Sequence, residues 1–214
     1  MTEALLSRLA QQFPLRALDV GEMGSLKANG MTFTVEAYEA EGLGHVSVMR
    51  ATGFFGLMKM DTLIVNPTAL DLPLYSYDRI YAMGNDTLIV ELYDSQLSPF
   101  AAEGLAAVKA AYTDLPERDP GAHWYDEIKL AESLSKKGKR ADTARLNELA
   151  TAHWDAYLNA PAAVADAACK RAKAAVYVEG LLQNGGPSTD VFKRSLGDEK
   201  TAQLFRKVLF GTDK

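Results

Sequence analysis

The sequence predicts an α+β fold in which an antiparallel sheet lies between two helical layers. A two-residue period runs from Met31 to Asp94, and helical spacing dominates from about residue 98 onward. The connections between the strand segments are too short for crossover helices, which indicates an antiparallel meander. Both faces of the sheet carry apolar residues, so each needs a covering layer. We therefore predict a three-layer α/β/α sandwich, formed by one domain over residues 1–214 because no linker or repeat divides the chain.

A helix and a glycine-punctuated segment precede the predicted sheet. Residues 3–13 carry apolar side chains at helical spacing, and Pro14 stops the pattern. A loop or hairpin then extends to Gly30. We expect five strands, at residues 33–38, 45–51, 57–65, 74–83 and 87–93. The last two are joined by a tight turn at residues 84–86.

Helices are predicted for most of the second half of the chain. Ser98 is a suitable N-cap, and Pro99 suits the first position of a helix over residues 100–112. The expected further helices cover 124–134 with a polar end at 135–140, a segment capped by Asp142, a segment from Pro161 to about Gln183, and two short segments capped by Ser188 and Asp198.

Composition excludes several classes of protein. The chain is 48% hydrophobic and 24% charged, and its net charge of −5 argues against general nucleic-acid binding. Its one cysteine, Cys169, cannot form an internal disulfide or hold an iron–sulfur cluster, and we expect it to be a small buried residue. No apolar run approaches the roughly 20 residues of a membrane span, and the N-terminus does not resemble a signal peptide. We expect a cytoplasmic protein without a membrane segment.

Motifs for metal, nucleotide or nucleophilic-serine chemistry are missing from the sequence. The three histidines, His45, His123 and His153, lie far apart and lack ligand spacing. His153 belongs to an apolar helical stripe, which favours a hydrogen-bonded core histidine over a catalytic one. The sequence contains no H-x-x-x-H, C-x-x-C, G-x-G-x-x-G or G-x-S-x-G pattern.

A carboxyl interrupts the fourth predicted strand. By alternation, Asp78 shares a face with Leu74, Ser76, Ile80 and Ala82, whereas Tyr75, Tyr77, Arg79 and Tyr81 point the other way. If the preceding strand is its neighbour, Asp61 could lie on the same surface. Two carboxyls in a partly dry cleft push their pKa values apart, and the raised one holds a proton at neutral pH. The alternative is a surface pair of Asp61 with Lys59 and a salt bridge from Asp78 to an arginine.

Two basic groups stand out in this acidic chain. One is the run Lys136, Lys137, Lys139 and Arg140, and the other is the C-terminal group Lys193, Arg194, Lys200, Arg206 and Lys207. Both groups are explained if they are helix ends that lie in solvent. The functional alternative is docking of an acidic partner, because complementary charge steers encounter.

Two segments of the chain resemble the ferredoxin-dependent bilin reductases. Asp71-Leu-Pro-Leu-Tyr-Ser-Tyr-Asp78 is similar to the family's Asp-Leu-Pro-Ile-Phe-Gly-Ala-Asp segment. The tail from Tyr177 to Gly211 resembles the family's C-terminus, in which a tyrosine-containing helix, an x-Asp-Pro turn, a short helix, Gly-Glu-Glu and a last helix closing on Leu-Phe follow one another. Together the segments cover about a fifth of the chain. The related red chlorophyll catabolite reductases share the fold.

The resemblance implies a linear tetrapyrrole bound between the sheet and the C-terminal helices. Enzymes of this family carry no flavin, metal or nicotinamide; ferredoxin delivers single electrons to the bilin, which passes through radical states, and the protein places the protons. Asp78 coincides with the family's central aspartate and is the implied proton donor. Asp61 is a second candidate catalytic residue, and Lys129, Arg171 and Arg194 are candidates to hold the propionates. Ferredoxin would be the protein partner, and the protein itself would be a monomer or a homodimer.

The chain departs from the family at two positions. The family's aspartate before proline in the C-terminal turn is Gly186 here, and the histidine on the strand before the central aspartate is replaced by the segment Lys59-Met-Asp61. A single two-electron reduction therefore fits better than a four-electron one. Two alternatives to an enzyme remain: a tetrapyrrole-binding or carrier protein with the same fold, and an interaction module whose basic groups dock a protein.

Overall fold

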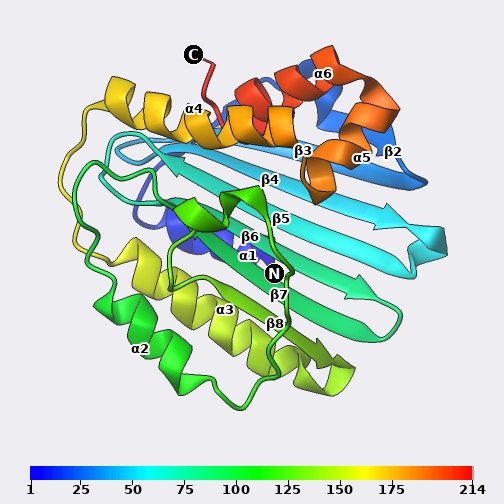
Figure 1. Cartoon of the computed structure of the whole chain (residues 1–214), viewed down its shortest axis with the longest axis horizontal. Coiled ribbons are helices and arrows are strands. Elements are labelled where there is room, and N and C mark those ends of the chain that lie inside the picture. The colour runs from blue at the N-terminus through cyan, green and yellow to red at the C-terminus, as the bar shows by residue number, and fades with distance from the viewer. Residues whose placement is uncertain (214) are drawn as a thin grey trace.

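An eight-stranded antiparallel sheet forms the middle layer of the protein (Figure 1). The structure is a computed structural model, which describes residues 1–213. The strand order is β1-β3-β4-β5-β6-β7-β8, and β2 pairs with β3 beside β1. The strands are β1 (Leu15–Leu18), β2 (Ser25–Ala28), β3 (Met31–Ala40), β4 (Gly44–Gly53), β5 (Met58–Pro67), β6 (Leu74–Ala82), β7 (Asn85–Tyr93) and β8 (Leu134–Lys139).

Three helices cover one face of the sheet: α1 (Thr2–Ala10), α2 (Glu103–Ala111) and α3 (Thr143–Leu158) (Figure 1). Alternation along β6 directs Tyr75 and Tyr77 into this layer. The ring of Tyr75 lies 5.0 Å from that of Trp154, whose indole N–H donates a hydrogen bond to the Leu5 carbonyl at 3.0 Å. These aromatic contacts hold α1 and α3 together on the sheet.

The other face lies beneath the segment from residue 167 onward. It is covered by α4 (Ala167–Asn184), α5 (Pro187–Leu196), α6 (Asp198–Gln203) and the π-helical turn Leu204–Leu209. Buried polar residues of β4 and β5 fix that turn to the sheet. Carbonyl oxygens of Val208, Leu209 and Phe210 lie 2.7–2.8 Å from side chains of His45, Ser47 and Asn66, respectively. The predicted three-layer α/β/α arrangement is thus confirmed.

Several predicted elements are wrong in detail. Residues 124–134 do not form a helix: a 3₁₀ turn, Trp124–Ile128, is followed by strand β8. The basic run at 136–140 therefore begins on an edge strand and is not a helix end. Lys136 points inward and donates to the carbonyls of Tyr112 and Leu115 at 3.2 Å. Charged residues on an edge strand also discourage pairing with another sheet.

The start of α4 was also predicted wrongly. The helix begins at Ala167 instead of Pro161, where the Asp166 carboxylate accepts a hydrogen bond from the Cys169 N–H at 2.8 Å. Cys169 is exposed, contrary to expectation, because it lies in this first turn. His153 is buried as expected, between the Tyr75 hydroxyl at 3.2 Å and the Glu132 carbonyl at 3.1 Å. Within residues 1–213, no helix has the length and apolar character needed to cross a bilayer.

Candidate active site

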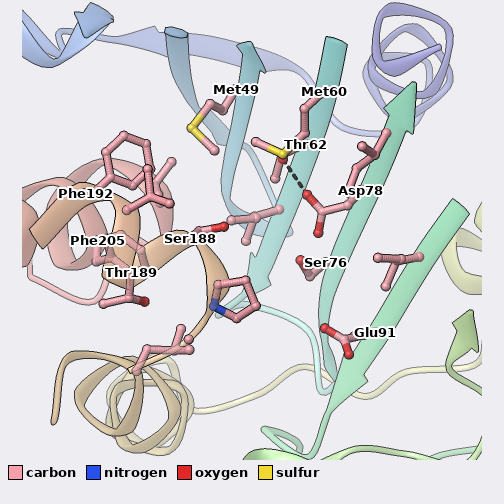
Figure 2. Close-up of a pocket in the computed structure, with 18 of the residues that line it drawn as sticks. Met49, Met60, Thr62, Ser76, Asp78, Glu91, Ser188, Thr189, Phe192 and Phe205 are labelled. Atoms are coloured by element: carbon pink, nitrogen blue, oxygen red, sulfur yellow. Dashed lines mark hydrogen bonds between the residues drawn. The ribbon is translucent and has the colours of Figure 1, made fainter. Parts of the chain in front are cut away.

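A cavity of about 340 Å³ lies between the sheet and the C-terminal helices. Its floor comes from β3 to β7, and its roof from α4, α5, the π-helical turn and the segment before β8. Apolar side chains make up most of the wall, with a few polar groups among them, as in small-molecule sites. Figure 2 shows Met49, Met60 and Phe192 on the apolar side and Asp78, Ser76 and Glu91 on the polar side.

Asp78 projects from β6 into this cavity. Its face is the predicted one, shared with Ser76 and Ile80. Among the described residues, Thr62 is its one hydrogen-bond donor, with Oγ1 at 2.5 Å from the Asp78 carboxylate. No arginine pairs with Asp78 in the described chain, since Arg79 is bound to Asp86 on the opposite face at 2.5 Å.

The surroundings of Asp78 favour its protonated form. Burial raises the pKa of this carboxyl to about 6, the Thr62 hydrogen bond opposes the rise, and the negative charge of Glu91 adds to it. A carboxyl with such a pKa keeps its proton up to about pH 6, and about a tenth of the molecules still carry that proton at pH 7. The site therefore offers a proton donor built from aspartate.

Asp61 does not lie beside Asp78, so the expected carboxyl pair is wrong. The strands β5 and β6 are neighbours, but their register places Thr62 opposite Asp78 and Asp61 opposite Arg79. Asp61 therefore points to the far face, where its carboxylate lies 3.9 Å from the N-terminal ammonium of Met1. Successive residues of a strand point to opposite faces, so a one-residue difference in register decides whether Asp61 or Thr62 lies beside Asp78.

Glu91 is the second carboxyl of the cavity, and it was not predicted. It lies on β7 opposite Ser76, on the same face as Asp78. The hydroxyl of Tyr93 donates to it at 2.6 Å. Tyr93 stacks on Tyr177 with ring centroids 3.9 Å apart, and burial raises the pKa of both phenols well above the usual value, so both remain hydroxyl donors.

Two basic side chains and the N-terminus of a helix line another part of the wall. Arg118 and His123 reach the cavity from the irregular segment before β8, and His123 stacks on Tyr125 at 4.8 Å. The first turn of α5 faces the same space with Ser188 and Thr189 (Figure 2). A helix N-terminus carries free N–H groups, and an arginine carries a fixed positive charge, so both suit a carboxylate.

The three predicted propionate-binding residues lie elsewhere. Lys129 is near the cavity but not on its wall, with Nζ 2.5 Å from Asp126 and 3.9 Å from Glu91. Arg171 is half-buried on α4, and Arg194 is exposed on α5; neither lines the cavity. Arg118 was missed because it sits in a loop, where no periodicity assigns a direction to a side chain.

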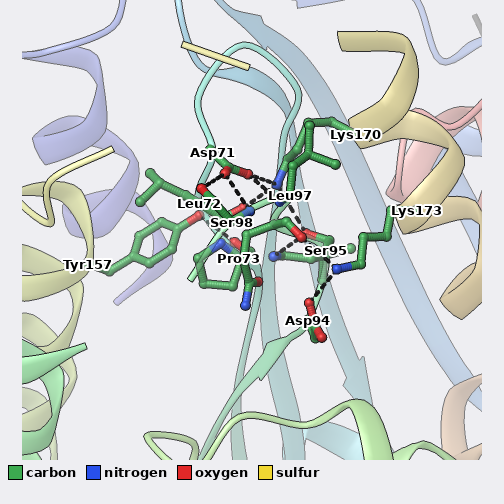
Figure 3. Close-up of polar contacts among 12 residues, drawn as sticks. Asp71, Leu72, Pro73, Asp94, Ser95, Leu97, Ser98, Tyr157, Lys170 and Lys173 are labelled. Atoms are coloured by element: carbon green, nitrogen blue, oxygen red, sulfur yellow. Dashed lines mark hydrogen bonds and ion pairs between the residues drawn. The ribbon is translucent and has the colours of Figure 1, made fainter. Parts of the chain in front are cut away.

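The other aspartate of the family-like segment has a structural role (Figure 3). The Asp71 carboxylate accepts from the N–H groups of Leu97 and Ser98 at 2.6 and 3.0 Å. Buried Lys170 of α4 lies 3.7 Å from Asp71 and donates to the Leu72 carbonyl at 2.5 Å. These contacts fix the start of β6, and with it the strand that carries Asp78.

The wall is suited to a largely apolar molecule that bears carboxylates and accepts a proton. Within residues 1–213, no cluster of three His, Cys, Asp or Glu side chains is placed to hold a metal ion. The visible groups can supply proton donation from Asp78 and carboxylate binding at Arg118 and the first turn of α5.

Comparison with solved structures finds this fold in phytochromobilin synthase from tomato, crystallised in complex with biliverdin. The TM-score is 0.79, and the aligned region covers 99% of this chain and 82% of that one. The two sequences are 13% identical, so the likeness concerns the fold. No protein-family model matches the sequence, and no curated protein sequence matches it significantly. The chain thus shares its fold with phytochromobilin synthase.

Proposed function

We propose that the protein reduces a linear tetrapyrrole of the biliverdin type. In this proposal ferredoxin supplies the electrons one at a time, Asp78 donates a proton, and the protein carries no bound cofactor of its own. The observation that carries the proposal is the protonatable Asp78 in an apolar cavity, at the position of the central aspartate in the family-like segment. The fold shared with a biliverdin-bound synthase supports the choice of ligand.

The cavity offers matching groups for such a ligand. Methionine and phenylalanine side chains of the sheet and of α5 would contact the flat pyrrole rings. Arg118 and the first turn of α5 would hold propionate carboxylates in place of the lysine and arginines expected from the sequence. The polar strip of Asp78, Ser76 and Glu91 would then face the reacting edge of the tetrapyrrole.

The role of the protein in the reaction is to hold the ligand and deliver protons. Reduction of one double bond takes two electrons and two protons, and each electron oxidises one ferredoxin. The O–H bond of Asp78 breaks as a new bond to hydrogen forms on the bilin. Thr62 then donates its hydrogen bond to the resulting carboxylate. Apolar walls exclude bulk water, which restricts protonation to the atoms that face the acids.

Asp78→Asn is the direct test. The protein is incubated without oxygen with biliverdin and a ferredoxin reducing system, and visible absorbance is followed. We expect the wild type to convert biliverdin, and Asp78→Asn to bind it but lose at least about 100-fold in rate, because general acids contribute 10²–10⁴-fold. Asp61→Asn is a matched control, since Asp61 lies on the other face. An Asp78→Asn protein with wild-type turnover would refute this assignment.

A non-catalytic tetrapyrrole-binding protein is the second candidate. It is favoured by Gly186, which replaces an acid of the family, and by Asp61, which the register removes from the cavity. This candidate requires biliverdin to bind, with a shift in its visible spectrum, and to stay unchanged when reduced ferredoxin is supplied. The same anaerobic experiment therefore separates the two functions.

A further inference from the structure

The second carboxyl of the cavity occupies a defined place relative to the first. In the register of β6 and β7, Asp78 is opposite Ile89 and Glu91 is opposite Ser76. Asp78 and Glu91 are therefore diagonal neighbours on one sheet face, at a backbone separation of about 7–8 Å. A tetrapyrrole is longer than this separation, so one bound molecule can touch both acids. Figure 2 shows the two side chains facing the same space with Ser76 between them.

The two acids differ in their polar neighbours. Asp78 is half-buried, and Thr62 is its one hydrogen-bond donor among the described residues. The Glu91 side chain is 16% exposed, and its carboxylate lies 3.9 Å from Lys129, which in turn contacts Asp126 at 2.5 Å. The Asp126 side chain is 37% exposed. Glu91 therefore stands at the inner end of a polar chain that leads out of the cavity.

Glu91 is also held in one orientation. The Tyr93 hydroxyl donates to one carboxylate oxygen at 2.6 Å, while Lys129 lies nearest the other oxygen. Tyr93 is 2% exposed and stacked on Tyr177, so it cannot swing away without disturbing the roof. A carboxyl that is fixed at a cavity wall and connected to water is suited to repeated proton transfer.

We propose that Glu91 is the second proton donor of this site and that it is reprotonated from solvent along Lys129 and Asp126. This inference rests on the proposed function and completes its proton count. Asp78 supplies one proton and Glu91 the other, so that a bilin, two electrons and two protons give a dihydrobilin. In each transfer a carboxyl O–H bond breaks and a bond to hydrogen forms on the bilin. Both carboxylates then regain protons from water.

The test is reduction of bound biliverdin by Glu91→Gln under anaerobic conditions with excess reduced ferredoxin. We expect biliverdin to bind within about 3-fold of wild-type affinity and the first electron to enter. The second protonation should slow at least about 100-fold, so that a partly reduced bilin accumulates. It is detected by electron paramagnetic resonance where the second electron enters only with the second proton, and by its visible absorbance where a closed-shell anion waits for that proton. Glu91→Asp keeps a carboxyl at the site, and we expect it to restore at least about a tenth of the wild-type rate.

Glu36→Gln is the matched control. Glu36 accepts a hydrogen bond from Tyr38 at 2.6 Å, two residues along its strand, just as Glu91 does from Tyr93. It lies outside the cavity, so its substitution should leave the rate unchanged.

Each other outcome decides against Glu91 as donor. A Glu91→Gln protein that completes reduction at the wild-type rate overturns the proposal while the proposed function stands. Loss of biliverdin binding in Glu91→Gln would assign Glu91 to ligand binding. If Glu91→Asp is as slow as Glu91→Gln, side-chain shape matters and not the acid. A wild-type protein that binds biliverdin without reducing it overturns both proposals.

Discussion

Asp78 is under two opposing influences that a single substitution can separate. Burial raises its pKa to about 6, and the hydrogen bond from Thr62 pulls that pKa down. If protonated Asp78 is the donor, the rate of the first protonation should be highest below about pH 6 and fall as pH rises through this value, because the carboxyl loses its proton. The measurement is the single-turnover rate against pH.

Thr62→Val moves this profile in a known direction. The variant keeps the shape of the side chain but removes the hydroxyl that stabilises the Asp78 carboxylate. We expect the fall in rate to shift upward by about one pH unit, since a hydrogen bond to a charged group contributes about 1.5–3 kcal/mol and one pKa unit corresponds to about 1.4 kcal/mol. Thr52→Val, at an exposed position, is the control. A shift downward would contradict the role given to Thr62.

At the scale of elements, the anchor at the start of β6 makes the protein sensitive to acid. Burial raises the pKa of Asp71, but hydrogen bonds from Ser98 and Leu97 and the charge of Lys170 outweigh this, so the net pKa is lowered. The stability contributed by Asp71 is therefore present above the unfolded pKa of about 3.9 and lost as pH falls through the folded value.

Asp71→Asn tests this anchor. We expect a loss of about 1–3 kcal/mol in the free energy of unfolding at neutral pH, because the amide cannot replace the charged acceptor and leaves the Lys170 ammonium without a carboxylate partner. The loss should shrink in acid, where the wild-type carboxyl is itself protonated. Denaturant unfolding at several pH values measures both. Asp19→Asn is the control, since exposed Asp19 caps only a local turn with the Gly21 N–H. A loss independent of pH would show that charge is not the cause.

Strand pairs show where sequence reasoning about the site ends. The sequence predicts the β6–β7 turn at residues 84–86, but the turn consists of Met83 and Gly84, both with positive φ. Such a turn favours asparagine at its first position, so Met83 gave no signal. A turn that is one residue longer places the opposite face of β7 beside Asp78, so the predicted turn does not bring Glu91 to the face of Asp78. The six-residue connection from Thr68 to Pro73 likewise left the faces of β5 and β6 unrelated, which misplaced Asp61.

Across the whole molecule, hydrophobic periodicity predicts the three layers correctly but does not predict the edge strands of the sheet. The central strands and the stripe of α3 bury large apolar side chains, so their period is strong. The edge strands β1, β2 and β8 are short and partly exposed, and β8 contains three lysines, so hydrophobic alternation could not reveal them. The face of Asp78 was correctly predicted because it follows from alternation within one strand.

The cavity should also lower the stability of the whole molecule. The unfolded chain ionises Asp78 above about pH 4, whereas the folded chain resists ionisation up to about pH 6. Between these values the folded state binds more protons, so stability falls as pH rises.

Asp78→Asn removes the charge and keeps an acceptor for Thr62. At neutral pH we expect a gain of about 1–2 kcal/mol in the free energy of unfolding, which disappears below about pH 4. Urea unfolding at both pH values measures it, with Asp61→Asn as the control on the other face. A loss of stability at neutral pH would mean that the site favours the Asp78 carboxylate, and Asp78 would then be a poor proton donor.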